Sequence, residues 1–213
     1  MHIPDGFIDP KTWISSAAVS AGVLGYGLRK TREKLGDRQI PTMGVMAAFI
    51  FAAQMVNFPI IGGTSGHLIG AVLAAIVLGP WAASIVMTTI LVIQCLVFLD
   101  GGLTALGANV LNMAIIAVFG GYYTYRWLTR LIKWERSWLP ATFIASWLSV
   151  LLAASACALE LAWSGTVPLN VALGAMLLWH LFIGLGEAII TTAIVAYLVN
   201  ARKELVLDHS AKV

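Results

Sequence analysis

Residues Gly66 to Leu99 read GHLIGAVLAAIVLGPWAASIVMTTILVIQCLVFL. Two apolar runs meet at Gly79-Pro80 within this segment, and glycine followed by proline stops a helix rather than continuing it. As a helix, the first run (Gly66–Gly79) would be only about 21 Å long, whereas the hydrocarbon core of a bilayer is about 30 Å thick. The segment is therefore either one long kinked helix or two helices joined by a tight turn.

The basic residues distinguish these alternatives, because Lys and Arg concentrate in the cytoplasmic loops of membrane proteins. With two helices in residues 66–99, the chain has seven spans and every basic residue except Lys11 faces the cytoplasm. With one helix, the second basic cluster would lie outside. We therefore expect an all-α membrane protein with seven transmembrane helices, its N-terminus outside and its C-terminus cytoplasmic. The three basic clusters are Arg29, Lys30, Arg32, Lys34 and Arg38; Arg126, Arg130, Lys133 and Arg136; and Arg202, Lys203 and Lys212.

The composition supports a membrane location. Of 213 residues, 60% are apolar and 11% are charged, and the mean hydropathy is +0.89. A soluble domain carries roughly 25% charged residues, because polar surface must cover its core. The net charge of +3 is spread over cytoplasmic anchors rather than gathered on one phosphate-binding face, which argues against a soluble enzyme and a nucleic-acid binder. Cys95 and Cys157 lie in apolar runs and are expected to be buried free thiols.

The other apolar runs supply the remaining spans, since a span needs about 17–25 mostly apolar residues. The chain is expected to be one membrane domain, with an extracytoplasmic segment at residues 1–11, a bundle at 12–200 and a cytoplasmic tail at 201–213. Besides the short run, the expected spans are Thr12–Leu28, Thr42–Phe58, Trp81–Leu99, Leu103–Leu128, Leu139–Trp163 and Asn170–Asn200.

The chain opens with Met1-His2, which can act as a chelator. No signal peptide is recognisable, and His2 is too bulky to favour removal of Met1, so we expect a free α-amine on the outer face. This amine, the backbone nitrogen of His2 and its Nδ1 can wrap one metal in fused five- and six-membered rings. With a fourth nitrogen the set would be planar, which suits Ni(II) or Cu(II). The simpler interpretation is an exposed polar terminus.

His67 is the candidate for the fourth nitrogen, because the expected topology places its loop on the same side as the N-terminus. The Gly-rich backbone before His67 is irregular, and irregular backbone is tolerated at membrane depth only where it lines a cavity or is covered by protein. The first ten residues can extend about 33 Å at most, so His2 can reach His67. The alternative is that Ser65 or Thr64 simply caps a helix beginning at His67.

Three motifs resemble the CbiM/NikM family of substrate-binding membrane subunits of energy-coupling-factor transporters for cobalt and nickel. They are Met1-His2-Ile3-Pro4-Asp5-Gly6, Gly62–His67 and Asp100–Asn109, and the resemblance extends over nearly the whole chain. It implies a seven-helix fold with an outward N-terminus, and a metal site formed by Met1, His2 and His67. Cobalt-type members often carry Pro-Thr-Gly after the loop histidine. The different residues here favour Ni2+ over Co2+ as the transported ion.

The resemblance also implies partners in the cell membrane of a prokaryote. These are a coupling transmembrane subunit, paired ATPase subunits and a small accessory membrane subunit. The chain has no phosphate-binding Gly-x-x-x-x-Gly-Lys-Ser/Thr loop, so it is expected to bind no nucleotide and to be no enzyme. The alternatives are a cobalt-specific member serving cobalamin synthesis and a self-sufficient carrier or channel. A carrier would need ionisable residues throughout the membrane depth, and a hydrolase using Ser65 and His67 would need an orienting carboxylate.

Several polar residues are candidates for contacts with the site. Ser65, Asp100 and Asn109 are candidates for supporting the metal ligands, and the alternative for Asp100 is that it caps the next helix or orders its loop. Asn112 lies one turn from Asn109 and should share its helix face. Amides within spans usually hydrogen-bond to neighbouring helices, which is the expectation for Asn109, Asn112, Gln94 and Asn57, with a role in holding the metal loop as the alternative.

The remaining candidates are ionisable residues within the spans and small residues that allow close packing of helices. His180 and Glu187 share a face of the last span and are expected to pack or pair inside the bundle, well away from the outer site. Glu160 is expected near the interface. Ala17 and Ala21 have the four-residue spacing that lets helices approach closely. In this family such a patch docks onto the coupling subunit, with internal packing as the alternative.

Overall fold

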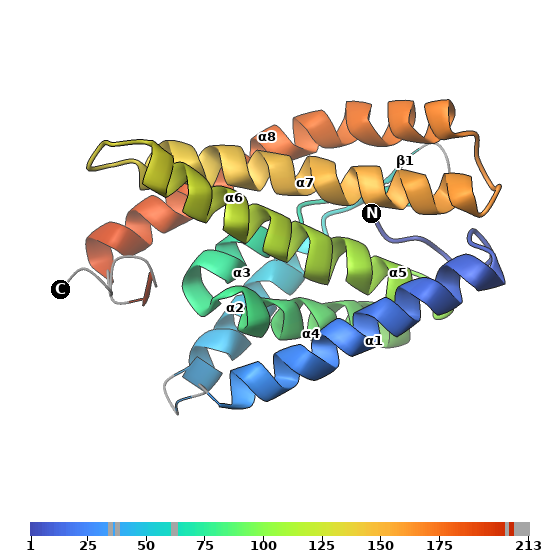
Figure 1. Cartoon of the computed structure of the whole chain (residues 1–213), viewed down its shortest axis with the longest axis horizontal. Coiled ribbons are helices and arrows are strands. Elements are labelled where there is room, and N and C mark those ends of the chain that lie inside the picture. The colour runs from blue at the N-terminus through green and yellow to red at the C-terminus, as the bar shows by residue number, and fades with distance from the viewer. Residues whose placement is uncertain (34–35, 37–38, 61–63, 203–204, 207–213) are drawn as a thin grey trace.

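The computed structural model describes residues 1–33, 36, 39–60, 64–202 and 205–206. In this part of the chain it shows seven helical segments and one short hairpin (Figure 1). The elements are α1 (Pro10–Arg32), α2 (Gln39–Gln54), β1 (Phe58–Ile60), β2 (Thr64–Gly66), α3 (Ala71–Leu78), α4 (Pro80–Phe98), the continuous run of α5 (Leu106–Val110), η1 (Leu111–Ile116) and α6 (Ala117–Leu131), α7 (Trp138–Trp163) and α8 (Leu169–Ala201).

The apolar segment around Gly79-Pro80 forms two helices, as predicted. α3 ends at Leu78 and α4 begins at Pro80, and Gly79 between them has a φ of 78°. A positive φ favours glycine, which has no Cβ to clash. Pro80 takes the first position of α4, where the missing N–H would have had no partner within the helix. Together these residues produce the turn that adds a helix to the bundle.

Two local expectations were wrong. The helix predicted to reach Phe58 ends at Gln54, and Phe58–Ile60 instead pairs antiparallel with Thr64–Gly66. The helix predicted to begin at His67 begins only at Ala71. Strands of three residues are too short to show an alternating pattern, so the hairpin left no signal in the sequence. Gly62 and Gly63 lie outside the described residues.

α3 is the most enclosed helix of the bundle. All of its residues from Ala71 to Val77 are buried, and it packs against α2, α4, α6, α7 and α8. Its three alanines let neighbouring backbones approach closely, as small residues do in membrane proteins. α3 is only 8 residues long, about 12 Å, so it lies within the bundle and cannot cross a bilayer alone.

Four helical segments are long and apolar enough to cross a membrane: α4, the α5–α6 run, α7 and α8. α2 is apolar but has only 16 residues. α1 has 23 residues, and serine, threonine and basic side chains lower its hydropathy. Length and composition therefore support four of the seven predicted spans individually. The prediction that α1, α2 and α3 are also membrane helices rests on their packing in the bundle with these four.

The ends of the bundle differ in charge. The C-terminal ends of α1, α6 and α8 lie at one end in Figure 1, and the basic residues of the last turns of α1 and α6 lie there. The start of α1, the α4–α5 connection and the α7–α8 connection lie at the opposite end. This arrangement agrees with the expected clustering of basic residues on one side. The orientation of the two ends across the membrane stays a prediction. Lys34, Arg38, Lys203 and Lys212 lie outside the described residues.

The contact between α1 and α5 supplies a test of the packing. A Cβ on Gly107 would lie 2.5 Å from the Cα of Ala17, so Gly107→Ala must push the two helices apart. Overpacking of this kind costs about 1–3 kcal/mol. Gly25→Ala is the matched control, since a Cβ there would meet nothing within 4 Å. We expect Gly107→Ala to lower the thermal unfolding midpoint in detergent and Gly25→Ala to leave it unchanged. Equal midpoints for both variants would contradict this packing.

Candidate metal site

The N-terminal segment, residues 1–9, folds back into the bundle and is held there through its backbone. Ile3 is fully buried, and its N–H donates to Oδ1 of Asn109 (2.8 Å). Nδ2 of Asn109 donates back to the carbonyl of Ile3 (3.1 Å), and the N–H of Gly102 donates to the same carbonyl (2.8 Å). The side-chain amide of Asn109 thus pairs with the backbone of Ile3 as a neighbouring strand would, and holds the residue next to His2.

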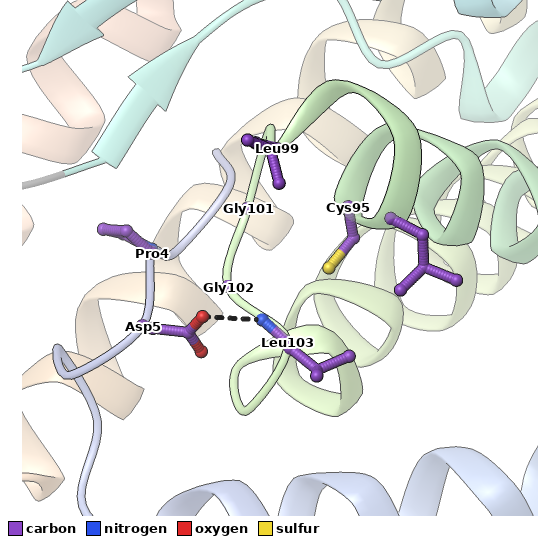
Figure 2. Close-up of a pocket in the computed structure, with 8 residues that line it drawn as sticks. Pro4, Asp5, Cys95, Leu99, Gly101, Gly102 and Leu103 are labelled. Carbon is purple, nitrogen blue, oxygen red and sulfur yellow. Dashed lines mark hydrogen bonds between the residues drawn. The ribbon is translucent and has the colours of Figure 1, made fainter.

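Asp5 fixes the next turn of this segment. Its carboxylate accepts hydrogen bonds from the N–H of Leu103 (3.1 Å) and from the N–H (2.8 Å) and Oγ1 (2.6 Å) of Thr104. Figure 2 shows the bond between Asp5 and Leu103 beside Gly102. These bonds hold the pKa of Asp5 below its ordinary value. A Cβ on Gly102 would lie 2.3 Å from the backbone nitrogen of Asp5, so only glycine allows this approach.

The α-amine of Met1 lies in the interior. It donates to the backbone oxygen of Ser65 and to Oγ of the same residue (3.1 Å). Burial lowers the pKa of this amine from 8.0 to about 5, opposed in part by Cys157 and Asp100. The amine is therefore neutral at pH 7 and carries a lone pair that a metal can use.

His2 presents the nitrogen that a chelate needs. Its Nε2 lies 3.1 Å from Oε1 of Gln94, and an amide oxygen can only accept, so Nε2 carries the proton and Nδ1 keeps its lone pair. Burial and the neighbouring amine lower the pKa of His2 to about 3, against the hydrogen bond that His2 donates to Gln94. The backbone N–H of His2 donates to Oγ of Ser65 (3.1 Å). We expected Gln94 to bond to a neighbouring helix, with holding of the metal loop as the alternative, and the structure places it beside His2.

His67 presents a second free nitrogen. Its Nδ1 lies 2.7 Å from the carbonyl oxygen of Leu68, so Nδ1 carries the proton and Nε2 has the lone pair. This Nε2 is buried without a hydrogen-bond partner. Burial, and then the nearby amine and His2, hold the pKa of His67 well below its ordinary value. The rings of His2 and His67 stack, with centroids 4.6 Å apart.

The structure therefore brings Met1, His2 and His67 together, as the sequence predicts. Among the described residues, no group of three or more His, Cys, Asp or Glu side chains is placed to hold a metal. The donors that the structure brings together here are the α-amine, the backbone nitrogen of His2 and the two imidazoles. Four nitrogens of this kind suit Ni(II) or Cu(II), which stabilise planar nitrogen sets. Ser65 contacts both the amine and the His2 amide.

Asp100 adds negative charge beside this nitrogen set. Its Oδ1 lies 3.3 Å from Nδ1 of His2, and its Oδ2 accepts a hydrogen bond from Asn57 (3.0 Å). Burial raises the pKa of Asp100, partly offset by the nearby N-terminal amine and by the hydrogen bond from Asn57. A carboxylate oxygen facing an imidazole lone pair is favourable only with a proton or a cation between them. Asp100 thus lies where its charge would favour a cation.

Asn112 hydrogen-bonds to a neighbouring helix, as expected: its Nδ2 donates to Glu160 of α7 (2.6 Å), whose other oxygen accepts from Ser16 (3.2 Å). The expectation for Glu160 was wrong, because it is buried inside the bundle rather than interfacial. The π-helix that begins at Leu111 changes the angular spacing along this run, so residues three apart need not serve the same neighbours.

The expected depth of Glu187 was also wrong. Its carboxylate accepts hydrogen bonds from the N–H groups of Ile69 (2.5 Å) and Gly70 (3.0 Å), directly after His67. His180 is fully buried on the same helix, and its Nδ1 donates to the carbonyl of Met176 (2.7 Å). α8 therefore reaches the site loop, which the sequence position of these residues did not reveal.

The small residues of α1 divide into two roles. Ala17 is half-buried and packs against Gly107, which agrees with internal packing rather than docking. Ala21 is exposed. Cys95 and Cys157 are free and buried, as predicted.

Comparison with known proteins adds a family assignment. Residues 2–205 match the family model described as CbiM, cobalt uptake substrate-specific transmembrane region. A putative fused nickel transport protein of Archaeoglobus fulgidus is 46% identical over 99% of this chain and 70% of its own length. A cobalt transport protein CbiM of Pelobacter propionicus is 30% identical over 96% of this chain and 93% of its own length.

A solved structure shares the fold. The crystal structure of a truncated transition metal transporter has a TM-score of 0.87 and 41% sequence identity. The similarity covers 94% of this chain and 99% of that chain.

The hold of Asn109 on Ile3 can be tested by hydrogen exchange. Asn109→Ala would leave the buried N–H of Ile3 unpaired, and a loss of this kind costs about 1–3 kcal/mol. We expect exchange in residues 2–5 to become about 5- to 150-fold faster. Asn112→Ala is the control, because Asn112 bonds to Glu160 instead. If both variants exchange like the wild type, Asn109 does not anchor the segment.

Proposed function

The chain belongs to the CbiM family, and we propose that it captures Ni(II), or alternatively Co(II), outside the cell for an energy-coupling-factor transporter. The observation that carries this proposal is the pair of imidazole lone pairs beside the neutral amine of Met1: Nε2 of His67 has no hydrogen-bond partner, and Nδ1 of His2 faces Oγ of Ser65 (3.5 Å) and Oδ1 of Asp100 (3.3 Å). The backbone nitrogen of His2 would be the fourth donor after losing its proton. The metal would then be held at the nitrogen edges of the two rings and by the amine, because imidazole lone pairs lie in the ring plane.

Nickel is the better match to this donor set. Planar coordination by four nitrogens stabilises Ni(II), whereas Co(II) accepts the same ligands without requiring that plane. The names of the relatives include both metals, since the Archaeoglobus protein is described as a nickel transporter and the Pelobacter protein as a cobalt transporter. A cobalt-specific member serving cobalamin synthesis is the alternative within the same site chemistry.

The energy for uptake would come from partner subunits. The sequence contains no phosphate-binding loop, so we assign ATP hydrolysis to paired ATPase subunits and the movement to a coupling transmembrane subunit, with a small accessory membrane subunit beside them. The exposed face of α1 at Ala21 is the proposed contact with the coupling subunit. We propose that the end of the bundle holding the basic residues faces the cytoplasm, because Lys and Arg collect on that side.

Removal of His67 tests the ligand set. His67→Ala leaves the three donors of residues 1–2 and opens the fourth position to water, so we expect Ni(II) affinity in detergent to fall at least about 100-fold, beyond the losses seen for residues that merely support ligands. The measurement is competition with a chromogenic chelator. His209→Ala in the tail is the matched control and should bind like the wild type. Affinity of His67→Ala within about threefold of the control would remove His67 from the site.

The pH dependence separates a buried site from a flexible terminus. The pKa values of about 5 for the amine and about 3 for His2 mean that both are neutral between pH 6 and 8. Only the His2 amide then releases a proton on binding, so affinity should rise about tenfold per pH unit. Below pH 5 the amine protonates and the slope should steepen. An unanchored Met-His terminus would already release more protons near pH 7. Dissociation constants at pH 6, 7 and 8 measure the slope, and a slope near two would contradict burial of the amine.

A further inference from the structure

Glu187 is a buried membrane carboxylate whose partners are backbone amides. Its side chain lies in α8 with 2% of its surface exposed. Both oxygens are occupied, one by the N–H of Ile69 (2.5 Å) and the other by the N–H of Gly70 (3.0 Å). Within the described residues, neither oxygen is bonded to a lysine, arginine or histidine. Ionisable groups are costly inside a membrane, so those that occur there usually have a specific task.

The peptide unit between Leu68 and Ile69 connects this carboxylate to His67. The N–H of that unit belongs to Ile69 and donates to Glu187. Its C=O belongs to Leu68 and accepts the proton of Nδ1 of His67 (2.7 Å). One rigid peptide plane therefore has Glu187 on one side and the His67 ring on the other.

The backbone that follows the Leu68–Ile69 peptide is also hydrogen-bonded to α2. Nε2 of Gln54 in α2 donates to the carbonyl of Ile69 (2.7 Å), and Gln54 is fully buried. Gly70 follows with a φ of 79°, and a Cβ there would lie 2.9 Å from Ile50. The backbone after His67 is thus fixed between α2 and α8.

We propose that Glu187 is the positioning residue for His67, acting through the Leu68–Ile69 peptide to direct Nε2 toward the metal. The proposal rests on the proposed function. The carboxylate of Glu187 fixes the peptide plane between Leu68 and Ile69. The carbonyl of that peptide accepts the proton of Nδ1 of His67, so Nε2 of the same ring keeps its lone pair. A histidine ligand becomes a stronger base when its other nitrogen donates a hydrogen bond. A carboxylate that accepts the N–H of the Leu68–Ile69 peptide polarises that peptide and so strengthens its carbonyl as an acceptor for His67. Glu187 itself touches no metal ligand atom.

Glu187→Gln tests this proposal because it keeps the size of the side chain. The amide oxygen can accept one N–H, while the amide NH₂ faces the other N–H and repels it. We expect the Ni(II) affinity to fall about 10- to 100-fold, as for residues that orient metal ligands. The visible spectrum of bound Ni(II) should move toward that of His67→Ala. Glu160→Gln removes another buried carboxylate, bonded to Asn112 and Ser16, and should bind like the wild type.

A double-mutant cycle distinguishes positioning from general loss of structure. If Glu187 acts through His67, the variant with both changes should bind no more weakly than His67→Ala alone. Additive losses, or an unchanged affinity in Glu187→Gln, would overturn the proposal. Wild-type protein and His67→Ala are measured in parallel, and equal affinities of these two would instead contradict the proposed function.

Gln54→Met provides the same test if Glu187→Gln does not fold. It removes the donor to the carbonyl of Ile69 while keeping the length of the side chain. We expect a smaller loss of Ni(II) affinity, which should likewise disappear when His67 is already alanine. A loss that persists undiminished in the His67→Ala background would overturn the proposal as well.

Discussion

Backbone polar groups buried in a membrane protein must all find partners, and this requirement underlies the whole site. Three irregular segments meet: the N-terminal segment, residues 67–70 and residues 100–104, with residues 5–6 and 103–104 at the surface and the rest buried or half-buried. Such backbone is tolerated at membrane depth only where protein covers it. Each segment is satisfied by side chains from elsewhere in the sequence, with Asn109 bonded to Ile3, Asp5 to residues 103–104 and Glu187 to residues 69–70. Pairing of the backbone is thus what brings the amine and two imidazoles to one place.

The same burial sets the chemistry of the donors. Removal from water disfavours positive charge, so the amine of Met1 and the ring of His2 have lowered pKa values and offer lone pairs at neutral pH. A divalent cation bound there would be neutralised by the ionised amide of His2 and by the nearby carboxylate of Asp100. A soft, nitrogen-rich site of this kind selects against Mg²⁺ and Ca²⁺, which prefer oxygen ligands.

Features with a local signal could be predicted from the sequence. Gly-Pro interrupts a helix in any context, so Gly79-Pro80 predicts a helix boundary. The positions of the basic clusters indicate how many helices lie between them, and together these signals predicted the seven helical segments. The chelating potential of Met1-His2 is likewise local. Contacts between distant residues at the site could not be predicted. Gln94 lies 92 residues from His2, and Glu187 lies 118 residues from Ile69, so no spacing rule relates them. The short hairpin and the π-helix at residues 111–116 also have no local signature.

The central claim is that the amine of Met1 and the adjacent amide of His2 bind the metal in one chelate. Insertion of a single glutamine between Met1 and His2 tests it most directly, because a residue of this size keeps Met1 in place while the insertion enlarges the chelate and moves the amine. The visible absorption spectrum of the Ni(II)-loaded protein is the measurement. We expect the band of planar, four-nitrogen Ni(II) in the wild type and its loss in the variant, which keeps its helical circular dichroism. An identical Ni(II) spectrum in both proteins would contradict ligation by the amine.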